Sequence, residues 1–340
     1  MPRGWLRECS VASENSSGQG LGWRCGGRRS GRRRAPWRRK HAKQLVKHAS
    51  TANRRLIVSA DDFGLSPAVN AGIVTAHREG ILTNASIMVN GQAFEEAVEL
   101  ARALPSLGVG LHLVLVQGFS TLPPSSAGGL VRASGEFPRS AVWAGLRYFF
   151  QRSLHDLLER EVRAQVEKFL ATGLQLSHVD GHLNIHMHPT VLNLLVRIAS
   201  EYGIRALRLP YEPIGLTLRA SRWQWWRKLT EAAIFRALVR YARPRLEAAG
   251  IRYPDYLFGL HQSGRMTEPY LRFVLAHLPA GVTEIYTHAS FLDDEARRWR
   301  PAHYESEAEV RALTSREIRR LIERQQIELI RYTDLGVAAR

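Results

Sequence analysis

The 340-residue sequence has only two cysteines, Cys9 and Cys25, and both lie close to its beginning. Neither a disulfide framework nor a cysteine-based metal site can therefore support the fold, and a reducing cytoplasm is the expected compartment. No run of about 18 or more uncharged apolar residues occurs, so no transmembrane helix is predicted. Glycine motifs for phosphate binding are also missing, because GxGxxG does not follow the first predicted strand and GxxxxGK[ST] occurs nowhere. A doubly wound nucleotide-binding sheet is therefore disfavoured.

The formal charge of +17 is concentrated at one end of the chain. Residues 1–55 carry 15 basic and 2 acidic residues, whereas the other 285 residues carry 33 basic and 29 acidic ones. The first stretch is rich in Arg, Gly and Ser and has no apolar core of the kind that a secretory signal needs. We expect residues 1–53 to be a disordered basic tail. It is either a polybasic arm that binds anionic lipid or nucleic acid, or an extension without function, which is the interpretation that we favour.

From Arg54 onward, short apolar runs alternate with segments of helical periodicity. Ser66 at a helix N-cap position and Pro67 at the first helical position predict a helix that ends at Gly80. The other predicted strands begin at residues 85, 108, 283 and 327, around "ALRLP" (206–210) and near "LSHVDGH" (176–182); the other predicted helices cover residues 93–104, 141–172, the segment from Pro189 and 307–324. This alternation predicts an α/β fold, an irregular (β/α) TIM-like barrel of parallel strands with crossover helices. Residues 54–340 would form this single domain, with a Trp/Arg-rich helical insertion around 214–250.

Acidic and imidazole side chains gather where the predicted strands end. The first strand ends at Asp61 and Asp62, the third holds His112, the next unit holds His178, Asp180 and His182, and a late strand holds His288. A solitary histidine in a strand is more often a packed core residue. In a parallel barrel, however, the carboxyl ends of the strands build the active site, so the coincidence of four such ends predicts a functional site.

One carboxylate and two imidazoles from different strands make a three-ligand metal site with open positions for water and substrate. The second Asp beside the ligand Asp can then act as a general base on a water molecule. The spacing does not tell which of Asp61 and Asp62 has which role. Of the three alternating histidines, His182 directly follows the strand end and is the expected ligand, whereas His186 and His188 are expected to pack or to support the ligands.

Four segments, in order, resemble the YdjC/ChbG-like carbohydrate deacetylases: "SADDFGLS", "GVGLHLVL", "SHVDGHLNIHMHP" and "EIYTHAS". The likeness covers about residues 54–337, and "LIVSADDFGLSPAVNAGIVTAHREGILTNASIMVNG" with the "GFSTLPP" loop is most similar to the hopanoid-biosynthesis-associated HpnK branch. The resemblance implies an irregular (β/α) barrel that removes an acetyl group from an N-acetylated sugar with the help of a divalent metal ion.

The resemblance also implies roles for single residues. Asp62, His112 and His182 would hold the metal ion, Asp61 would be the catalytic base and His288 the general acid. Arg208, at the end of "ALRLP", could orient a carboxylate or a sugar hydroxyl and is a candidate for substrate binding, with a surface arginine as the alternative. The chain departs from its relatives at two positions. Asn184 replaces a usual His, and Ala289 stands where a Pro often follows the late His.

Two segments favour a lipid-linked substrate. Residues 218–246 combine Trp223, Trp225 and Trp226 with many arginines, and residues 142–154 are similarly aromatic and basic. Tryptophan with Arg or Lys on an amphipathic helix suits a membrane interface, but the same stripes could cover the barrel or form a dimer contact. For the HpnK branch, the resemblance implies an N-acetylglucosaminyl group on a bacteriohopane polyol. If the two segments do serve a lipid-linked substrate, we expect a soluble cytoplasmic enzyme that works at the inner face of the cytoplasmic membrane.

Alternatives come from other classes. A deacetylase of soluble N-acetylglucosamine oligosaccharides keeps the chemistry and changes the substrate. A (β/α)-barrel sugar isomerase or aldolase would commonly need a Lys or additional Glu ligands, and no strand end offers a lysine. A membrane or nucleic-acid adaptor would rely on the basic tail; the domain itself is expected to bind no nucleic acid. Two His and one Asp accept Zn, Mg, Mn or Fe, so one divalent ion, Zn or Mg, is the expected cofactor.

Overall fold

The computed structural model describes residues 53–336. The basic tail predicted for residues 1–53 therefore lies outside the described residues except for Asn53, and so do both cysteines. Within the described range, seven strands pair in parallel in the order β4-β3-β2-β1-β6-β5, and β7 pairs with the beginning of β1. The strands are β1 (Arg54–Phe63), β2 (Asn84–Ile87), β3 (Gly108–Leu113), β4 (Val179–Gly181), β5 (Tyr256–Phe258), β6 (Gly281–Thr287) and β7 (Glu328–Leu329).

The parallel α/β fold predicted from the alternating pattern is confirmed, and its barrel is irregular. The "ALRLP" segment lies between the edge strands β4 and β5 and forms isolated bridges only, in which Leu207 pairs with Val179 of β4 and Ala206 with Arg252, four residues before β5. No regular strand forms in this segment, although the sequence predicts one. The middle strand β1 is buried along almost its whole length, as expected for a parallel strand covered on both faces.

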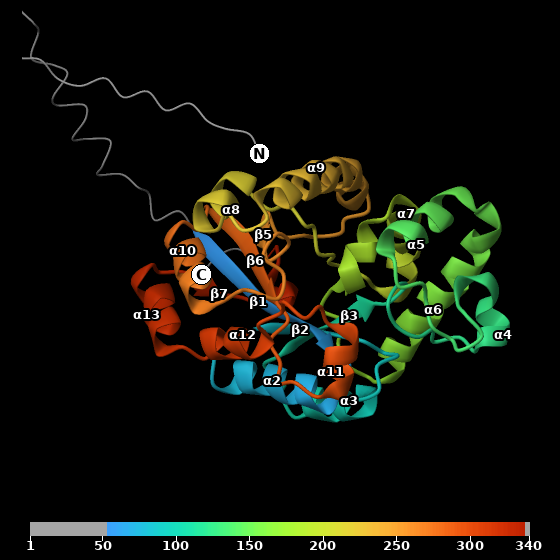
Figure 1. Ribbon diagram of the computed structural model, residues 1–340, viewed down its shortest axis with the longest axis horizontal. Helices are drawn as coiled ribbons and strands as arrows, with labels where there is room; N and C mark the ends of the chain where they lie inside the picture. Colours follow the sequence, from blue (N-terminus) through green and yellow to red (C-terminus); the bar gives the residue numbers. More distant parts are fainter. Residues whose placement is uncertain (1–52, 337–340) are drawn as a thin grey trace, which may run out of the picture. The chain divides into compact units, whose positions relative to one another are not determined.

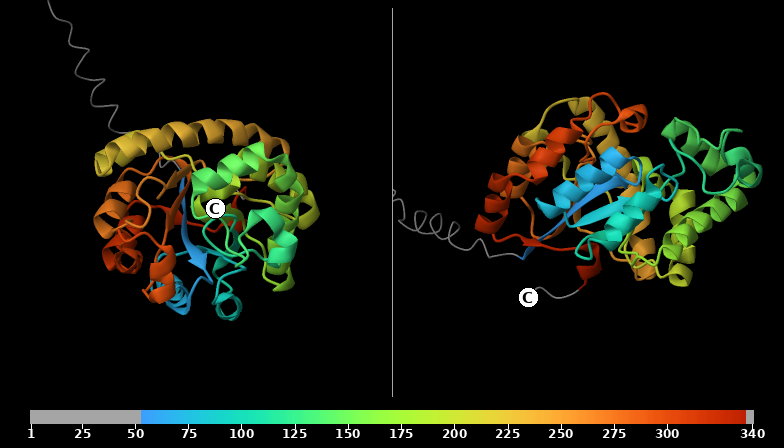
Figure 2. Two further views of the ribbon diagram at one scale, coloured as in Figure 1. Left: turned by 45° about the vertical axis from the view of Figure 1, so that its right-hand side comes forward. Right: turned by 90° about the horizontal axis from the view of Figure 1, so that it is seen from below.

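Helices surround the strands, with α8 and α9 on one side and α2 and α3 on the opposite side (Figures 1 and 2). The α-helices are α2 (Pro67–Arg78), α3 (Phe94–Arg102), α4 (Pro124–Ala127), α5 (Ala141–Phe150), α6 (His155–Ala171), α7 (Pro189–Tyr202), α8 (Ile214–Ala220), α9 (Trp225–Ala248), α10 (Glu268–Ala276), α11 (Asp294–Trp299), α12 (Ser306–Leu313) and α13 (Arg316–Arg324). Short 3-10 turns are η1 (Gly128–Leu130), η2 (Arg152–Leu154), η3 (His182–Met187) and η4 (Tyr332–Asp334).

Local chemistry explains where several elements begin and end. Helix α2 starts as predicted, with the Ser66 hydroxyl accepting from the Val69 N–H. The single helix predicted for 307–324 is wrong, because it breaks into α12 and α13. The Thr314 hydroxyl donates to the carbonyl of Val310, and Ser315 is extended, so this pair gives the backbone an alternative to a continuous helix.

The last predicted strand is shorter than expected. Only Glu328 and Leu329 pair with β1, and the chain then turns into η4, where the Asp334 carboxylate accepts from the Arg331 N–H. Helices α8 and α9 occupy the segment 214–250. Among the described residues, no helix is both long and apolar enough to cross a membrane.

Candidate active site

The adjacent carboxylates Asp61 and Asp62 face the same cavity. In a regular strand, successive side chains point to opposite faces. Strand β1 departs from this rule because its register with β2 shifts between Ala60 and Phe63, and because Asp62 has a left-handed backbone with φ of 69°. This bulge at the end of the strand turns both carboxylates toward the cavity.

Asp62, His112 and His182 come together at the ends of β1, β3 and β4, as predicted. Asp62 Oδ1 lies 3.4 Å from His112 Nε2 and 3.3 Å from His182 Nδ1, and the two nitrogens are 3.4 Å apart. Three donor atoms at this spacing fit one ion with metal–ligand distances of about 2.1 Å. Asp62 Oδ1 is buried and makes no hydrogen bond in the part of the chain that the structure describes. The donor set therefore fits a divalent metal ion.

Asp180 and Ser86 orient the His112 ring. His112 Nδ1 lies 2.8 Å from Asp180 Oδ1 and 3.1 Å from Ser86 Oγ, so Nε2 faces Asp62 and His182. A carboxylate on the other ring nitrogen of a metal-binding histidine fixes its tautomer and raises its basicity. Burial alone would lower the pKa of His112, but Asp180, together with the carboxylates of the cavity, raises it to about 9.

Arg300 holds the second oxygen of Asp62. Its Nη2 donates to Asp62 Oδ2 at 3.1 Å, while Nη1 donates to the His288 carbonyl and to the hydroxyls of Ser290 and Ser306. Burial alone would raise the pKa of Asp62, but the His182 imidazole and the Arg300 guanidinium hold it well below its ordinary value. The carboxylate is therefore ionised at neutral pH, with Oδ1 directed at the two imidazoles.

Arg208 lies beneath the carboxylate pair and is fully buried. Its guanidinium donates two hydrogen bonds of 2.8 Å to Asp61 and contacts Glu284 at 2.9 Å and Asp180 Oδ2 at 2.8 Å. It does not line the cavity. The alternative of a surface arginine is wrong. Of the predicted roles, the geometry supports the orientation of a carboxylate, that of Asp61, and gives no support to a contact with a sugar hydroxyl.

His288 follows β6 and lines the same cavity. The backbone N–H of His288 donates to Glu309 Oε2 at 2.6 Å. The ring packs against Tyr304 with centroids 4.9 Å apart, and ring Nδ1 is buried without a hydrogen-bond partner among the described residues. Burial dominates and lowers the pKa of His288 to about 4, although Asp61 and Asp62 act in the opposite direction. The ring is therefore neutral at pH 7.

The other histidines of this region lie outside the cavity. His178 stacks on Tyr332 with centroids 3.9 Å apart. His186 is buried with Nε2 3.0 Å from the Arg208 carbonyl, and burial lowers its pKa to about 4. His188 precedes α7 and packs against Tyr148. His186 thus contacts the backbone of Arg208 and His188 packs against Tyr148, and neither faces the cavity, in agreement with the expectation that they pack or support the ligands.

A strained turn follows His182. Leu183 and Asn184 both have left-handed backbones, with φ of 50° and 55°, a conformation that costs a residue with a β-carbon about 1–2 kcal/mol. Both line the cavity, and Asn184 Oδ1 is buried without a partner in the described chain. Such strain persists only where the surroundings impose it, and it clusters at functional sites.

These residues enclose a cavity of about 300 Å³ at the carboxyl ends of the strands. Helix α9 contributes Arg227, Glu231 and Phe235 at successive turns, which places these three side chains on one face of the helix. The opposite wall comes from the end of α11 and the following loop, through Trp299, Arg300, Pro301, His303 and Tyr304.

Sequence reasoning missed the residues that support the site from outside the strand ends. Arg300 and Glu309 come from the loop after α11 and from α12, where no motif marks them. Ser86 lies within β2 and has no distinctive neighbours in the sequence. Asp180 is the exception, because it stands two residues before His182 in the "HVDGH" segment that the sequence singled out.

Three comparisons with known proteins agree with this architecture. The family model described as "YdjC-like protein" matches residues 55–324. A carbohydrate deacetylase of Brevibacillus brevis is 32% identical over 282 residues, which span 83% of this chain and all of the relative. A chitooligosaccharide deacetylase of Salmonella typhi is 32% identical over 264 residues, 71% of this chain and 99% of the relative. A crystal structure of a proposed cellobiose-phosphate cleavage protein from Enterococcus faecalis aligns with a TM-score of 0.65 and 28% identity, covering 83% of this chain and 99% of that one.

Proposed function

The chain belongs to the YdjC-like protein family, and on this premise we propose that it is a carbohydrate deacetylase, a hydrolase that cleaves the amide C–N bond of an N-acetylated amino sugar. The observation that carries the proposal is the cluster of Asp62, His112 and His182 with Asp61 beside it in one cavity. The relatives named carbohydrate deacetylase and chitooligosaccharide deacetylase support the substrate class. The catalytic domain is proposed to be residues 54–340.

Asp62, His112 and His182 would hold one divalent ion, Zn or Mg. When bound, such an ion polarises the acetyl carbonyl and lowers the pKa of a water molecule. The residues of the chain do the rest. Asp61 takes a proton from the attacking water as the new C–O bond forms, and Arg208 keeps its carboxylate in one orientation.

His288 supplies the proton for the leaving nitrogen. The C–N bond breaks as that nitrogen is protonated, so the products are acetate and a free amino sugar. Since the ring is neutral at pH 7 in the resting protein, it must first take up a proton, and the proton that Asp61 removes from the water is the one available; passing it on to the nitrogen returns Asp61 and His288 to their starting states. Its neighbour Glu309 binds the backbone N–H and fixes the position of the residue.

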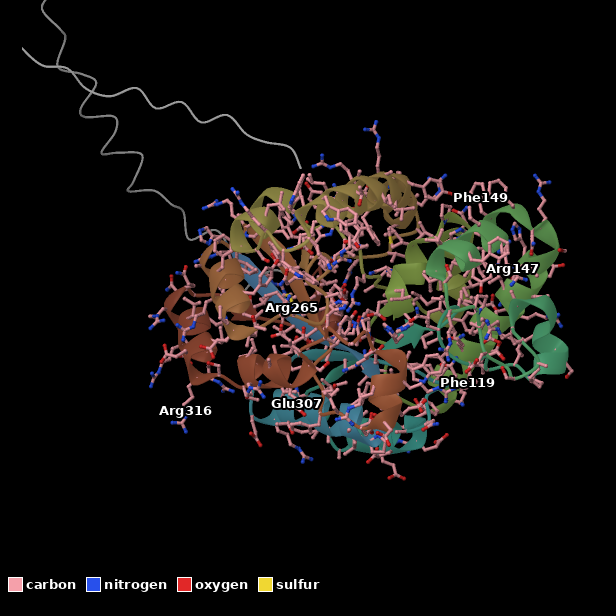
Figure 3. The ribbon with its side chains drawn as sticks, viewed as in Figure 1. Phe119, Arg147, Phe149, Arg265, Glu307 and Arg316 are labelled. Atoms are coloured by element: carbon pink, nitrogen blue, oxygen red, sulfur yellow. The ribbon has the colours of Figure 1, made fainter. Side chains whose placement is uncertain are left out.

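The substrate itself is proposed to be lipid-linked, an N-acetylglucosaminyl hopanoid, as the similarity to the HpnK branch implies. The surface of α5 supports this. In this ten-residue helix the aromatic side chains of Trp143, Phe149 and Phe150 are exposed, Phe150 by 72%. Arg147 on the same helix adds positive charge, and Figure 3 shows it with Phe149 at the periphery of the molecule. These side chains do not cover the barrel.

The start of α9 has the same character. Trp225 and Trp226 are exposed by 56% and 62%, and Leu229 is also exposed. Aromatic and apolar side chains next to arginines favour the interface of an anionic membrane. A peripheral position at a membrane surface would bring the cavity to a lipid-borne sugar without any membrane-spanning helix.

Acetate release by the purified protein tests the function. The substrates are an N-acetylglucosamine oligomer and a detergent-solubilised N-acetylglucosaminyl hopanoid, each with added Zn or Mg, and with Asp62→Ala as the inactive control. Release from the hopanoid alone supports the lipid substrate. Release from the oligomer alone keeps the deacetylase and rejects the lipid. No acetate from either substrate, in folded and metal-loaded protein, contradicts the proposed function.

The basic tail offers a second test. An adaptor that works through residues 1–53 would lose its binding when they are deleted, whereas a deacetylase made of residues 54–340 keeps its turnover. The proposal therefore expects the truncated protein to release acetate at the rate of the full chain.

A further inference from the structure

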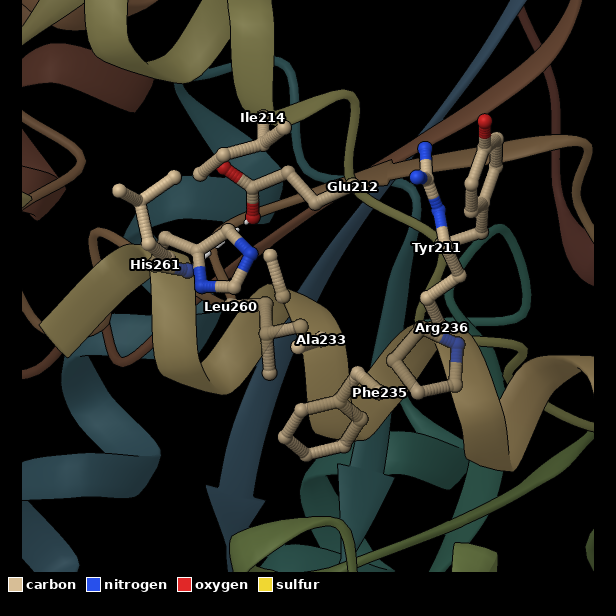
Figure 4. Close-up of a pocket in the computed structure, with 11 residues that line it drawn as sticks. Tyr211, Glu212, Ile214, Ala233, Phe235, Arg236, Leu260 and His261 are labelled. Atoms are coloured by element: carbon tan, nitrogen blue, oxygen red, sulfur yellow. Dashed lines mark hydrogen bonds between the residues drawn. The ribbon is translucent and has the colours of Figure 1, made fainter. Parts of the chain in front are cut away.

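A second, smaller cavity of about 190 Å³ lies under helix α9 (Figure 4). It sits at the carboxyl ends of the "ALRLP" segment and of β5, the same end of the strands as the metal-ligand cluster. Its walls are largely apolar and come from α9 and the two loops below it. The apolar lining residues are Pro210, Ile214, Leu229, Ala232, Ala233, Phe235 and Leu260, and the polar ones are Tyr211, Glu212, Arg236 and His261.

The two cavities are neighbours. Phe235 and Leu260 line both of them, so these two side chains form the partition. A further link runs through His261, which lines the smaller cavity and whose Nδ1 lies 3.2 Å from Glu231 Oε2 in the wall of the larger one. A group attached to a sugar in the larger cavity therefore has the smaller cavity within reach.

The smaller cavity also contains a buried carboxylate that the deacetylation does not use. Glu212 is 6% exposed. Its Oε1 accepts from the Thr217 hydroxyl at 2.5 Å, and its Oε2 accepts from the His261 N–H at 3.1 Å, the bond drawn in Figure 4. The Tyr270 hydroxyl also lies 3.5 Å from Oε1. These contacts fix the carboxylate, and Oε2, with one donor, keeps capacity for another.

The chemistry of the lining restricts the occupant. A purely apolar group would remove Glu212 from water without offering it a donor, which is unfavourable for a charge. A small ion would leave the apolar walls uncovered. The volume exceeds the roughly 150 Å³ of a cavity that holds benzene, so it suits one six-membered ring or a short chain of that size. The occupant that matches has hydroxyl donors on one side and C–H groups on the other.

We propose that this cavity binds a polyhydroxylated group linked to the acetylated sugar, with Glu212 accepting hydrogen bonds from its hydroxyls. The inference rests on the proposed function and specifies its substrate: the acetylated sugar carries a hydroxyl-bearing aglycone. A second sugar ring and the polyol chain of a glycolipid share this chemistry, and the arms of the experiment separate them.

The experiment compares three substrates with the full-length, metal-loaded protein. These are the methyl glycoside of N-acetylglucosamine, which has no hydroxylated aglycone, N,N′-diacetylchitobiose, and the detergent-solubilised N-acetylglucosaminyl hopanoid. Ala233→Phe fills the cavity, and Ala237→Phe, one turn further along the same helix and outside both cavities, is the matched control. Glu212→Gln removes the charge and keeps the size.

We expect kcat/KM to be higher by about tenfold or more for a substrate with the aglycone, the effect of one hydrogen bond to a charged group. Ala233→Phe should abolish this preference while sparing the methyl glycoside, Glu212→Gln should reduce it, and Ala237→Phe should keep it. Preference for chitobiose indicates a second sugar, and preference for the hopanoid indicates the polyol.

Turnover of all substrates with equal efficiency, or equal losses in Ala233→Phe on every substrate, overturns the inference but leaves the deacetylase intact. No acetate from any substrate contradicts the proposed function instead. In that case titration calorimetry with chitobiose still tests whether the smaller cavity binds a hydroxylated group. Binding by Ala237→Phe but not by Ala233→Phe supports the inference, whereas equal binding by both variants, or none, rejects it.

Discussion

The Arg208 guanidinium and the Asp61 carboxylate form two parallel hydrogen bonds, Nη1 to Oδ2 and Nη2 to Oδ1, each 2.8 Å long. Both side chains are buried. The planar fork of arginine fixes the rotation of the carboxylate as well as its position. Glu284 and Asp180 surround the same guanidinium, so one arginine is shared by three acids in the floor of the site.

Replacing Arg208 by Lys keeps the charge and removes the fork. We expect kcat to fall by about 100-fold, because small misplacements of a catalytic group have effects of this size, while KM changes little since Arg208 does not line the cavity. The melting temperature should fall as well, because the lysine leaves part of a buried acid cluster without donors. Steady-state kinetics and thermal unfolding measure both effects.

The matched control is Arg272→Lys, which alters an exposed i,i+4 ion pair with Glu268 and should change neither quantity. An Arg208→Lys protein with unchanged kcat would show that the orientation of Asp61 does not limit the reaction. A large increase in KM alone would return Arg208 to the role of substrate contact.

How far the sequence predicts this site depends on where each residue stands in the chain. Asp62 and His112 lie at or near the ends of strands that local apolar runs reveal, and the parallel topology then brings them together. Arg300 comes from an irregular loop, and its contact with Asp62 spans 238 positions of sequence. No local pattern encodes such a contact, because it depends on how α11 packs over the strands.

The same distinction applies to the fold. The start of α2 can be predicted from local sequence, because Ser66 is a good N-cap residue and Pro67 suits the first helical position. The break between α12 and α13 was missed because the apolar spacing continues through it, and the competing signal at Thr314 is a side-chain hydrogen bond to the backbone. The bulge that turns Asp61 and Asp62 to one side cannot be predicted from local sequence either, because it depends on the register between β1 and β2.

Asp180→Asn should weaken metal binding. The carboxylate that faces His112 Nδ1 at 2.8 Å fixes the ring and strengthens Nε2 as a donor, and loss of such a partner typically costs about 10–100-fold in metal affinity. Competition with a chromophoric chelator measures the affinity for Zn. The control is Asp294→Asn on the exposed first turn of α11. Equal affinities in the two variants would contradict the arrangement of ligands proposed here.

Glu309 should make the folded protein pH-sensitive. Burial raises the pKa of Glu309 from 4.5 to about 7, although the N–H groups of Met266 and His288 act against the rise. Between these two values the folded protein keeps a proton on Glu309 that the unfolded chain has lost, so the contribution of Glu309 to the free energy of unfolding falls as the pH rises from about 4.5 to 7. Glu309→Gln should lose this component of the pH dependence.

Urea unfolding at several pH values, compared between the wild-type protein and the variant, isolates the contribution of Glu309 because all other groups are shared. Glu307→Gln, an exposed acid on the same helix (Figure 3), is the control and should keep the wild-type slope. If Glu309→Gln runs parallel to the wild type over the whole range, Glu309 is ionised in the folded protein.

The exposed face of α5 should bind anionic membranes. The double change Phe149→Ser and Phe150→Ser removes two aromatic side chains that are exposed by 53% and 72%, so it should reduce binding to phosphatidylserine vesicles in a sedimentation assay without lowering the melting temperature. Leu170→Ser, an exposed apolar position on α6, is the control. Unchanged vesicle binding together with a loss of dimers in sedimentation velocity would assign this face to a second copy of the chain.

Leu183 gives the last test, because it separates strain from function. Leu183 has φ of 50°, a conformation that glycine adopts without steric cost. Leu183→Gly should therefore raise the free energy of unfolding by about 1 kcal/mol. Gln326 has φ of 52° but lies in the turn after α13, far in sequence from the cavity residues, so Gln326→Gly should give a similar gain.

The two variants should differ in turnover. Leu183→Gly frees the turn that holds Asn184 and follows the ligand His182, so kcat/KM should fall, whereas Gln326→Gly should leave it unchanged. Equal turnover in both would mean that the strained turn is only a consequence of the fold and that its rigidity contributes nothing to the reaction.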